Sequence, residues 1–221
     1  MKPTKVLILF YSFTGKTAEL AREIAQGVKE VPDTEVVVKR MPELIPDNFF
    51  AKEPGLKAIQ DKLFAEFSVA TSGDLVAADG VAFGTPVHFG SFSSQVKQYI
   101  DQLSPAWVQG KLINKPAAVF CSAASNHGGA EAALTSLTIP LLNLGMIPVG
   151  IPYPIRGEDP EFDAGSPYGA VFVSGHKGDK SLSEGDRKTA RILGRRLAAM
   201  AHMLNCGCDV CRACRELTKK L

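Results

Sequence analysis

Lys5-Val-Leu-Ile-Leu-Phe-Tyr-Ser-Phe-Thr-Gly-Lys-Thr17 is the stretch that decides the fold class. It begins with a continuous apolar run over residues 6–10, which is too short to span a membrane and lacks helical spacing. Such a run predicts a strand buried on both faces, as in a parallel sheet. Apolar residues then recur at three- and four-residue steps from Ala18 to Val28, which predicts a helix. The stretch therefore predicts a strand, a turn and a helix in succession.

The turn of this unit, residues 12–17, is rich in hydroxyl groups and lies where the helix begins. Free N–H groups and the helix dipole favour an anion there, so we expect a phosphate. A nucleoside-triphosphate loop is excluded because Phe10 stands where that motif has glycine, and the dinucleotide motif is excluded because Gly15 is the stretch's only glycine. Two interpretations remain: a site for one phosphate monoester, as on flavin mononucleotide (FMN), and an ordinary turn with a Ser/Thr cap.

Composition places the chain among ordinary globular proteins. It has 221 residues, 45% hydrophobic and 22% charged, with a formal net charge of +2. This charge gives no reason to expect a nucleic-acid partner, and no apolar run reaches the length of a membrane span. Four of the five cysteines crowd near the C-terminus, unlike the disulfide framework of a secreted protein. We expect a cytoplasmic protein with one domain over residues 1–205 and a cysteine-rich tail over residues 206–221.

The rest of the chain alternates between strand and helix patterns. Further strands are predicted at residues 34–39, 79–84, 116–121 and 146–150, and helices at 56–67, 96–103, 130–144 and 183–204. Residues 151–180 form a long connection rich in glycine and proline. The alternation predicts an α/β fold in which a doubly wound, five-stranded parallel sheet carries helices on both faces.

Three unusual segments, residues 12–17, 85–91 and 122–129, follow the first, third and fourth predicted strands. Ligands of such sheets bind beyond the carboxyl ends of the strands, so these segments should form one site. The first would bind the phosphate and the other two would bracket a planar ring. The candidate cofactor-binding residues are Ser12, Phe13, Thr14, Gly15, Lys16, Thr17, Pro86, Val87, His88, Phe89, Gly90, Ser122, Ala123, Ala124, Ser125, Asn126, His127 and Gly128. No side chain is assigned a catalytic role, because His88 and His127 are candidates by location alone.

The single tryptophan, Trp107, lies in a connection flanked by proline and glycine. It belongs either to the core or to a stacking wall over the ring.

The motifs as a whole resemble a known family. Tyr11-Ser12 with Gly15-Lys16-Thr17, Phe83-Gly-Thr-Pro86 with Phe89-Gly90, and His127-Gly-Gly with Glu131 are similar to the WrbA-type NAD(P)H:quinone oxidoreductases. The similarity continues through Leu144-Gly-Met-Ile147, Pro152-Tyr153, Gly165-Ser-Pro-Tyr-Gly169 and Ala190-Arg with Leu193-Gly-Arg195, and so runs from about residue 5 to about residue 204.

The resemblance implies a flavodoxin-like fold, noncovalent FMN, a homotetramer, and two-electron reduction of quinones by NADH or NADPH. It places Trp107 as an aromatic wall near the nicotinamide and the quinone. The chain departs from the family at Thr14, where relatives can carry tyrosine, and at Asn143-Leu144, where His-His is usual. Residues 47–74 are also longer than is typical.

The tail has no counterpart in that family. Cys208, Cys211 and Cys214 have the spacing of three ligands in a bacterial ferredoxin, with Cys206 as a possible fourth. The same thiolates could hold zinc, and the third interpretation is a reduced tail that binds no metal.

The leading functional hypothesis is a flavoenzyme that passes hydride from NADH or NADPH through flavin N5 to a quinone, with ping-pong kinetics. The alternative is a flavodoxin-like or iron–sulfur flavoprotein electron carrier, and a binding scaffold is the third hypothesis. Turnover of NADH with a simple quinone separates the enzyme from the carrier.

Overall fold

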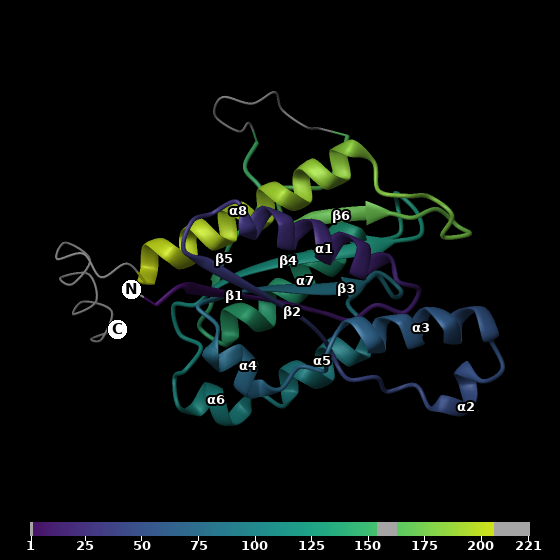
Figure 1. The fold of residues 1–221 in the computed structure, drawn as a ribbon, viewed down its shortest axis with the longest axis horizontal. Helices are drawn as coiled ribbons and strands as arrows, with labels where there is room; N and C mark the ends of the chain where they lie inside the picture. Colours follow the sequence, from purple (N-terminus) through teal and green to yellow (C-terminus); the bar gives the residue numbers. More distant parts are fainter. Residues whose placement is uncertain (1, 154–162, 206–221) are drawn as a thin grey trace.

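The computed structural model describes residues 2–153 and 163–205. Its strands are β1 (Thr4–Phe10), β2 (Thr34–Arg40), β3 (Gly80–Pro86), β4 (Pro116–Ala123), β5 (Ile147–Pro148) and β6 (Ala170–Val173). Its helices are α1 (Lys16–Lys29), α2 (Asp47–Phe50), α3 (Pro54–Glu66), α4 (Ser72–Ala77), α5 (Ser94–Asp101), α6 (Ser104–Val108), α7 (Ala130–Asn143) and α8 (Glu184–Asn205) (Figure 1). None of these helices is long and apolar enough to cross a membrane.

The strands form one parallel sheet in the order β2-β1-β3-β4-β5, with β6 also paired to β4. The predicted doubly wound parallel sheet is confirmed, and its fifth position is shared by two short segments. β5 pairs with the start of β4 at Pro116 and Ala117, whereas β6 pairs with its end from Phe120 to Ala123. The strand expected at 146–150 is thus only two residues long, and β6 lies inside the segment that we expected to be a connection.

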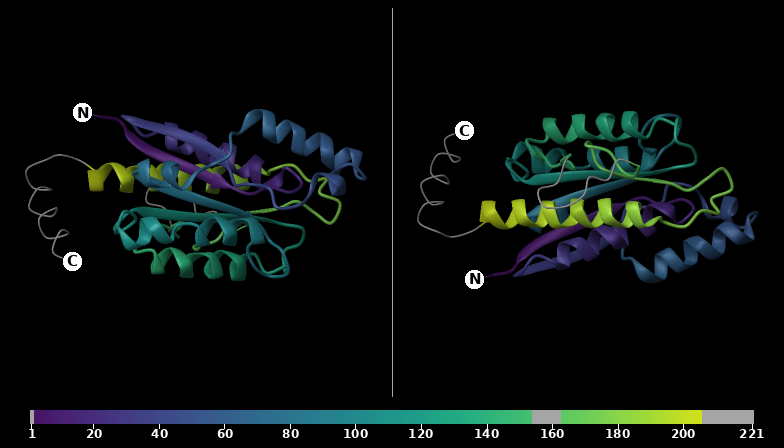
Figure 2. Two further views of the ribbon diagram at one scale, coloured as in Figure 1. Left: turned by 90° about the horizontal axis from the view of Figure 1, so that it is seen from below. Right: turned by 90° about the horizontal axis from the view of Figure 1, so that it is seen from above.

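Both faces of the sheet are buried, as the apolar run at its centre predicts. Along β1 and just beyond, Leu7, Leu9 and Tyr11 join the core under α4, α5 and α7, whereas Val6, Ile8 and Phe10 join the core under α1 and α8. Alternate side chains of a strand point to opposite faces, so a continuous apolar run fills two cores at once. Figure 2 shows the sheet between these two helical layers.

The helices α1 and α8 lie side by side along one face of the sheet (Figure 1). Their backbones touch at two glycines: a Cβ atom at Gly27 would collide with the carbonyl oxygen of Arg191, and one at Gly194 would collide with that of Ile24. At the rim of the contact, Glu23 accepts hydrogen bonds from Arg187 at 2.7 Å and from Arg191 at 2.8 Å. The contact joins the first helix of the chain to the last described one.

The helix α4 begins with a capping box, in which Thr71 and Asp74 bond each other's backbone N–H groups. Asp74 also accepts a hydrogen bond from Lys39 Nζ at 2.7 Å. Desolvation opposes ionisation of Asp74, but the bonds from Lys39 and Thr71 outweigh it and lower the carboxyl pKa to about 2. This carboxylate therefore ties α4 to β2 in its ionised form.

Candidate functional site

The turn after β1 has the features of a phosphate-binding loop. Gly15 has a φ of +85°, a left-handed conformation that turns the chain into α1. Ser12 and Thr17 are buried, and Ser12 Oγ accepts a hydrogen bond from the N–H of Ala18 at 3.3 Å. In the part of the chain that the structure describes, the N–H groups of residues 13–17 have no protein acceptor. These donors lie at the start of α1, the positive end of its helix dipole, which suits an anion.

Lys16 lies in this loop, but its charge is already paired. Its Nζ contacts Glu19 Oε1 at 2.8 Å and donates to the carbonyl oxygen of Lys180 at 3.2 Å. It also lies 5.8 Å from the centre of the Phe172 ring. Lys16 can thus offer a ligand its backbone N–H at the start of α1, while its ammonium group fastens the loop to the segment after β6.

The loop after β4 is bonded directly to the loops after β1 and β3. The hydroxyl oxygens of Thr17 and Ser122 lie 2.8 Å apart and share a hydrogen bond, and the N–H of Val87 donates to the Ser122 carbonyl at 2.8 Å. Gly129, with a φ of +89°, lies against Gly90 so closely that a Cβ on it would be 2.8 Å from the Gly90 Cα. The structure therefore brings the three predicted segments together at the carboxyl edge of the sheet.

The segment after β3 ends in a tight turn in which His88 and Ser91 exchange backbone hydrogen bonds of 2.9 and 3.0 Å. Its two central residues, Phe89 and Gly90, have φ values of +51° and +76°. The Phe89 side chain is fully exposed, and desolvation lowers the pKa of the His88 imidazole. A non-glycine residue held at positive φ is uncommon and is often found at a functional site.

The remaining ring-loop candidates divide by depth. Pro86 is half-buried, Ser122 and Ala123 are buried, and Gly128 is half-buried. Ala124, Ser125, Asn126 and His127 are exposed beside the turn at Phe89 and Gly90. The buried residues join the loops, so the exposed ones are left to face a ligand.

A fourth segment, after β6, belongs to the same edge and was missed from the sequence. The Ser174 N–H donates to the Ala123 carbonyl at 2.9 Å, and Lys180 supplies the carbonyl that binds Lys16. The signal for it was the short run Ala170-Val-Phe-Val173 between Gly169 and Ser174, which is typical of a buried strand.

Trp107 lies at the other end of the sheet (Figure 1). It is on α6, which comes after β3 and α5 have carried the chain back to the amino ends of the strands. Its indole Nε1 donates to the Asn143 carbonyl at 3.1 Å, just before β5 begins. Within one chain, therefore, the structure does not bring Trp107 to the three loops.

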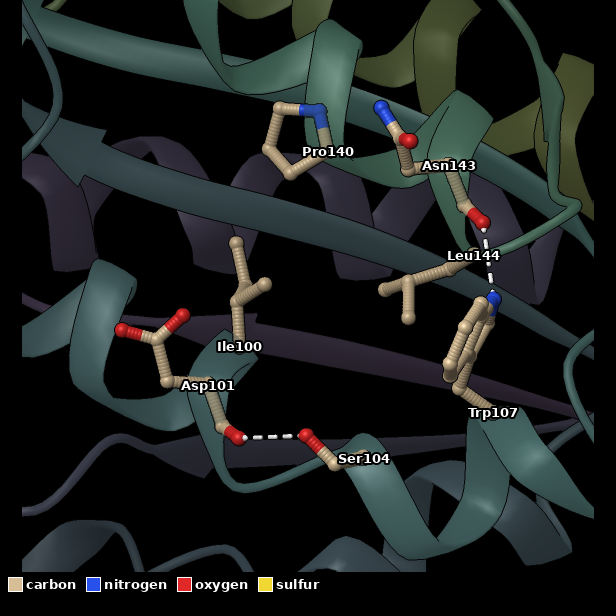
Figure 3. A pocket seen from close by; sticks show the side chains of 7 residues that line it. All are labelled: Ile100, Asp101, Ser104, Trp107, Pro140, Asn143 and Leu144. Carbon is tan, nitrogen blue, oxygen red and sulfur yellow. Dashed lines mark hydrogen bonds between the residues drawn. The ribbon is translucent and has the colours of Figure 1, made fainter.

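Trp107 instead forms one wall of a pocket of about 200 Å³ (Figure 3). Leu144 lies beside it, and Ile100 extends from α5 on the opposite side of the pocket. The full lining is Ile100, Asp101, Ser104, Trp107, Pro140, Asn143 and Leu144. Asn143 and Leu144, where the resemblance leads us to expect His-His, therefore line this pocket in the single chain.

Metal binding by the tail falls outside what the structure describes. Cys206, Cys208, Cys211 and Cys214 all lie beyond residue 205. Within residues 2–153 and 163–205, no three His, Cys, Asp or Glu residues are grouped so that they could hold a metal ion. The cysteine of the described part, Cys121, is buried, and desolvation raises the pKa of its thiol.

With this geometry established, comparison with known proteins identifies the family. The model of the NADPH-dependent FMN reductases matches residues 4–161. The chain belongs to this family. Among its relatives, the NAD(P)H dehydrogenase (quinone) of Geotalea uraniireducens is 39% identical over 90% of this chain and 98% of its own length. That of Geobacter sulfurreducens is 40% identical over the same shares. These matches confirm the resemblance found in the motifs.

Solved structures confirm the fold of this family member. A flavodoxin, WrbA-like protein from Agrobacterium tumefaciens superposes with a TM-score of 0.61 over 90% of this chain and 98% of its own, at 21% identity. A flavodoxin from the domain Archaea superposes with a TM-score of 0.57 over 90% of this chain and 99% of its own, at 14% identity. At these identities the likeness shows the fold alone, which is flavodoxin-like as expected.

Proposed function

We propose that the protein is an FMN-dependent oxidoreductase that uses NADH or NADPH to reduce quinones by two electrons. The observation that carries the proposal is the junction of three loops at one edge of the sheet, the first with a run of N–H groups that have no acceptor among the described residues. The names of relatives that match 90% of the chain support the same reaction.

The residues of the first loop fit the phosphate of FMN. The N–H groups of residues 13–17 would donate to its oxygens, and the buried Ser12 hydroxyl can add a further donor. The Lys16 ammonium is neutralised by Glu19, so backbone N–H groups and the α1 dipole would supply most of the attraction. A single phosphate monoester suits such a site better than a pyrophosphate, because the loop is short and has one glycine.

The segments after β3 and β4 would hold the flavin ring between them. Their joining contacts, from Val87 to Ser122 and from Gly90 to Gly129, hold the two segments at a fixed distance from each other before a ligand arrives. Such preorganisation limits the cost of binding and the entry of water. When bound, FMN would supply the redox chemistry, namely hydride acceptance at N5 and two-electron reduction of a quinone. The exposed residues 124–127 border the space in which either substrate would stack.

We further propose a homotetramer, in which Trp107 acts in a neighbouring subunit. Trp107 lies at the amino end of its own sheet, so it can form a wall over a flavin ring only if that ring belongs to another copy. Large apolar side chains are exposed around it, on α6, on the end of α7 and beside them: Val108, Ile113, Ile139, Leu142 and Ile147. Exposed apolar groups gathered in this way favour an interface between subunits.

The test begins with the absorption spectrum of the freshly purified protein, which reports bound flavin and any iron–sulfur cluster together. Initial rates are then measured while NADH and a simple quinone are both varied. Parallel double-reciprocal lines support one stacking site used in turn, and intersecting lines contradict it. An electron carrier would bind FMN without catalysing turnover. Bound FMN without turnover of NADH and quinone would therefore contradict the proposed enzymatic function. Light scattering at micromolar concentration tests the tetramer, and a monomer would exclude it.

A further inference from the structure

Gln60 is the point at which α3 touches the phosphate-binding loop. Its side chain is 2% exposed, and its Nε2 donates to the Ser12 carbonyl at 3.0 Å and to the Phe13 carbonyl at 2.6 Å. Two carbonyl oxygens can be bound only by the amide nitrogen, so the orientation of the amide is fixed. One buried side chain thus binds two successive peptide groups of a loop 47 and 48 residues away.

These two bonds determine where the N–H groups of the loop point. In a trans peptide the carbonyl and the N–H of the next residue lie on opposite sides of the chain. Because the Ser12 and Phe13 carbonyls face Gln60, the N–H groups of Phe13 and Thr14 face away from α3. Neither N–H has an acceptor among the described residues. Gln60 therefore turns two adjacent donors to the side of the loop that is free to bind an anion.

The position of Gln60 is itself fixed by the packing of α3. Arg22 on α1 donates from its Nε to Glu66 at 2.8 Å, and Leu63 is buried in the same core as Phe10. One residue before Gln60, Ile59 lies beside the glycine turn, with its Cγ2 3.4 Å from where a Cβ of Gly15 would be. Contacts before and after Gln60 along α3 thus hold its side chain against the loop.

The side-chain oxygen of Gln60, Oε1, makes the residue costly to bury. Its Oε1 is buried and has no hydrogen-bond partner among the described residues. A buried acceptor without a partner costs stability, so the two bonds made by Nε2 have to offset that cost. An apolar side chain of similar size would avoid this cost but would leave the two carbonyls without a donor.

We propose that Gln60 is a positioning residue that orients the Phe13 and Thr14 N–H groups toward the phosphate of the flavin. The inference rests on the proposed function, since it takes FMN as the ligand. It assigns a role to α3, none of whose residues was among the predicted site residues. It also predicts different effects on the two parts of the cofactor. Loss of Gln60 should weaken the binding of the phosphate and leave the binding of the ring unchanged.

The experiment compares FMN with riboflavin, which has the same ring and no phosphate. Dissociation constants for both are measured by fluorescence titration of the full-length apoprotein, for the parent protein, Gln60→Leu and Gln60→Glu. The leucine variant removes the donors, and the glutamate variant keeps the shape but presents an acceptor to two carbonyls. Gln95→Leu is the matched control, because Gln95 is also buried, at 3% exposed, but bonds Glu43 rather than the loop.

We expect FMN to bind about tenfold or more weakly to both Gln60 variants, because hydrogen bonds to a charged phosphate are strong. Riboflavin binding should change less than about twofold, and Gln95→Leu should leave the ratio of the two constants unchanged. A general weakening of the fold would lower both affinities alike, so an unchanged ratio in the Gln60 variants overturns the inference. If the parent protein itself fails to bind FMN, the proposed function fails first, which distinguishes the two outcomes.

Discussion

The contact between Gly129 and Gly90 gives a direct test of whether the segments after β3 and β4 hold the flavin ring. In Gly129→Ala the new Cβ would lie 2.8 Å from the Gly90 Cα, whereas ordinary contacts begin near 3.4 Å, so the two segments must separate by about 0.6 Å. The left-handed backbone adds about 1 kcal/mol of strain, and overpacking of this kind adds about 1–3 kcal/mol. We therefore expect the apoprotein to lose about 2–4 kcal/mol of unfolding free energy.

The matched control is Gly110→Ala. Gly110 also has a positive φ, of +65°, but lies just beyond α6 at the amino end of the sheet, and its nearest neighbour is the flexible tip of Ile113 at 3.3 Å. This variant should suffer the backbone strain alone and keep its flavin affinity. Urea unfolding measures stability, and fluorescence titration with FMN and riboflavin measures flavin affinity. Gly129→Ala should bind both flavins about tenfold or more weakly; flavin binding equal to that of Gly110→Ala would refute the reasoning.

Four further predictions follow from the same geometry. Thr17→Glu should abolish flavin retention through repulsion of the phosphate, and a normal flavin absorbance ratio after purification would contradict it. Trp107→Ala should retain FMN but lower kcat/KM for the quinone or the nicotinamide nucleotide, with a loss of about 1–3 kcal/mol of transition-state stabilisation calculated from initial rates. An unchanged kcat/KM for both substrates would exclude the stacking role. Deletion of residues 206–221 should leave flavin binding intact, because the site loops and α8 precede them, and loss of flavin would show that the tail is part of the core. Asp74 has a folded-state pKa of about 2 against 3.8 unfolded, so its stabilisation is complete above pH 3.8 and is lost as the pH falls toward 2. Asp74→Asn should remove about 1–2 kcal/mol of that dependence after solvent screening, seen in urea titrations between pH 2 and 5.

Local chemistry was enough to predict the first strand, its turn and its helix. Neighbouring residues determine both a fully apolar strand and a helix with periodic apolar residues. The turn that follows such a strand must lie at the carboxyl edge of the sheet. β6 was missed because four apolar residues among glycines and prolines carry little periodic signal. Their assignment as a strand depends on pairing with the end of β4, which lies about fifty residues earlier.

The position of Trp107 at the amino end of the sheet could have been predicted from the order of strands and helices. A residue that follows a strand lies at the carboxyl edge, but one that follows the next helix has been carried back. α5 has eight residues, and a helix of that length rises about 12 Å, about half the length of the seven-residue β3, and α6 follows it. The contacts of Lys16 with Lys180 and of Gln60 with the first loop could not be predicted in this way, since they join residues 164 and 47–48 positions apart.

The close contact of α1 with α8 sets the order in which the chain can finish folding. Gly27 and Gly194 are 167 residues apart (194 − 27), so α1 leaves the ribosome long before its partner helix is made. Until then α1 alone can cover the apolar side chains on that face of β1 and β4, and the part that lies under α8 stays exposed. A nascent chain that ends before α8 should therefore be a client of chaperones and proteases rather than a smaller folded unit. Completion of this core is tied to the synthesis of α8.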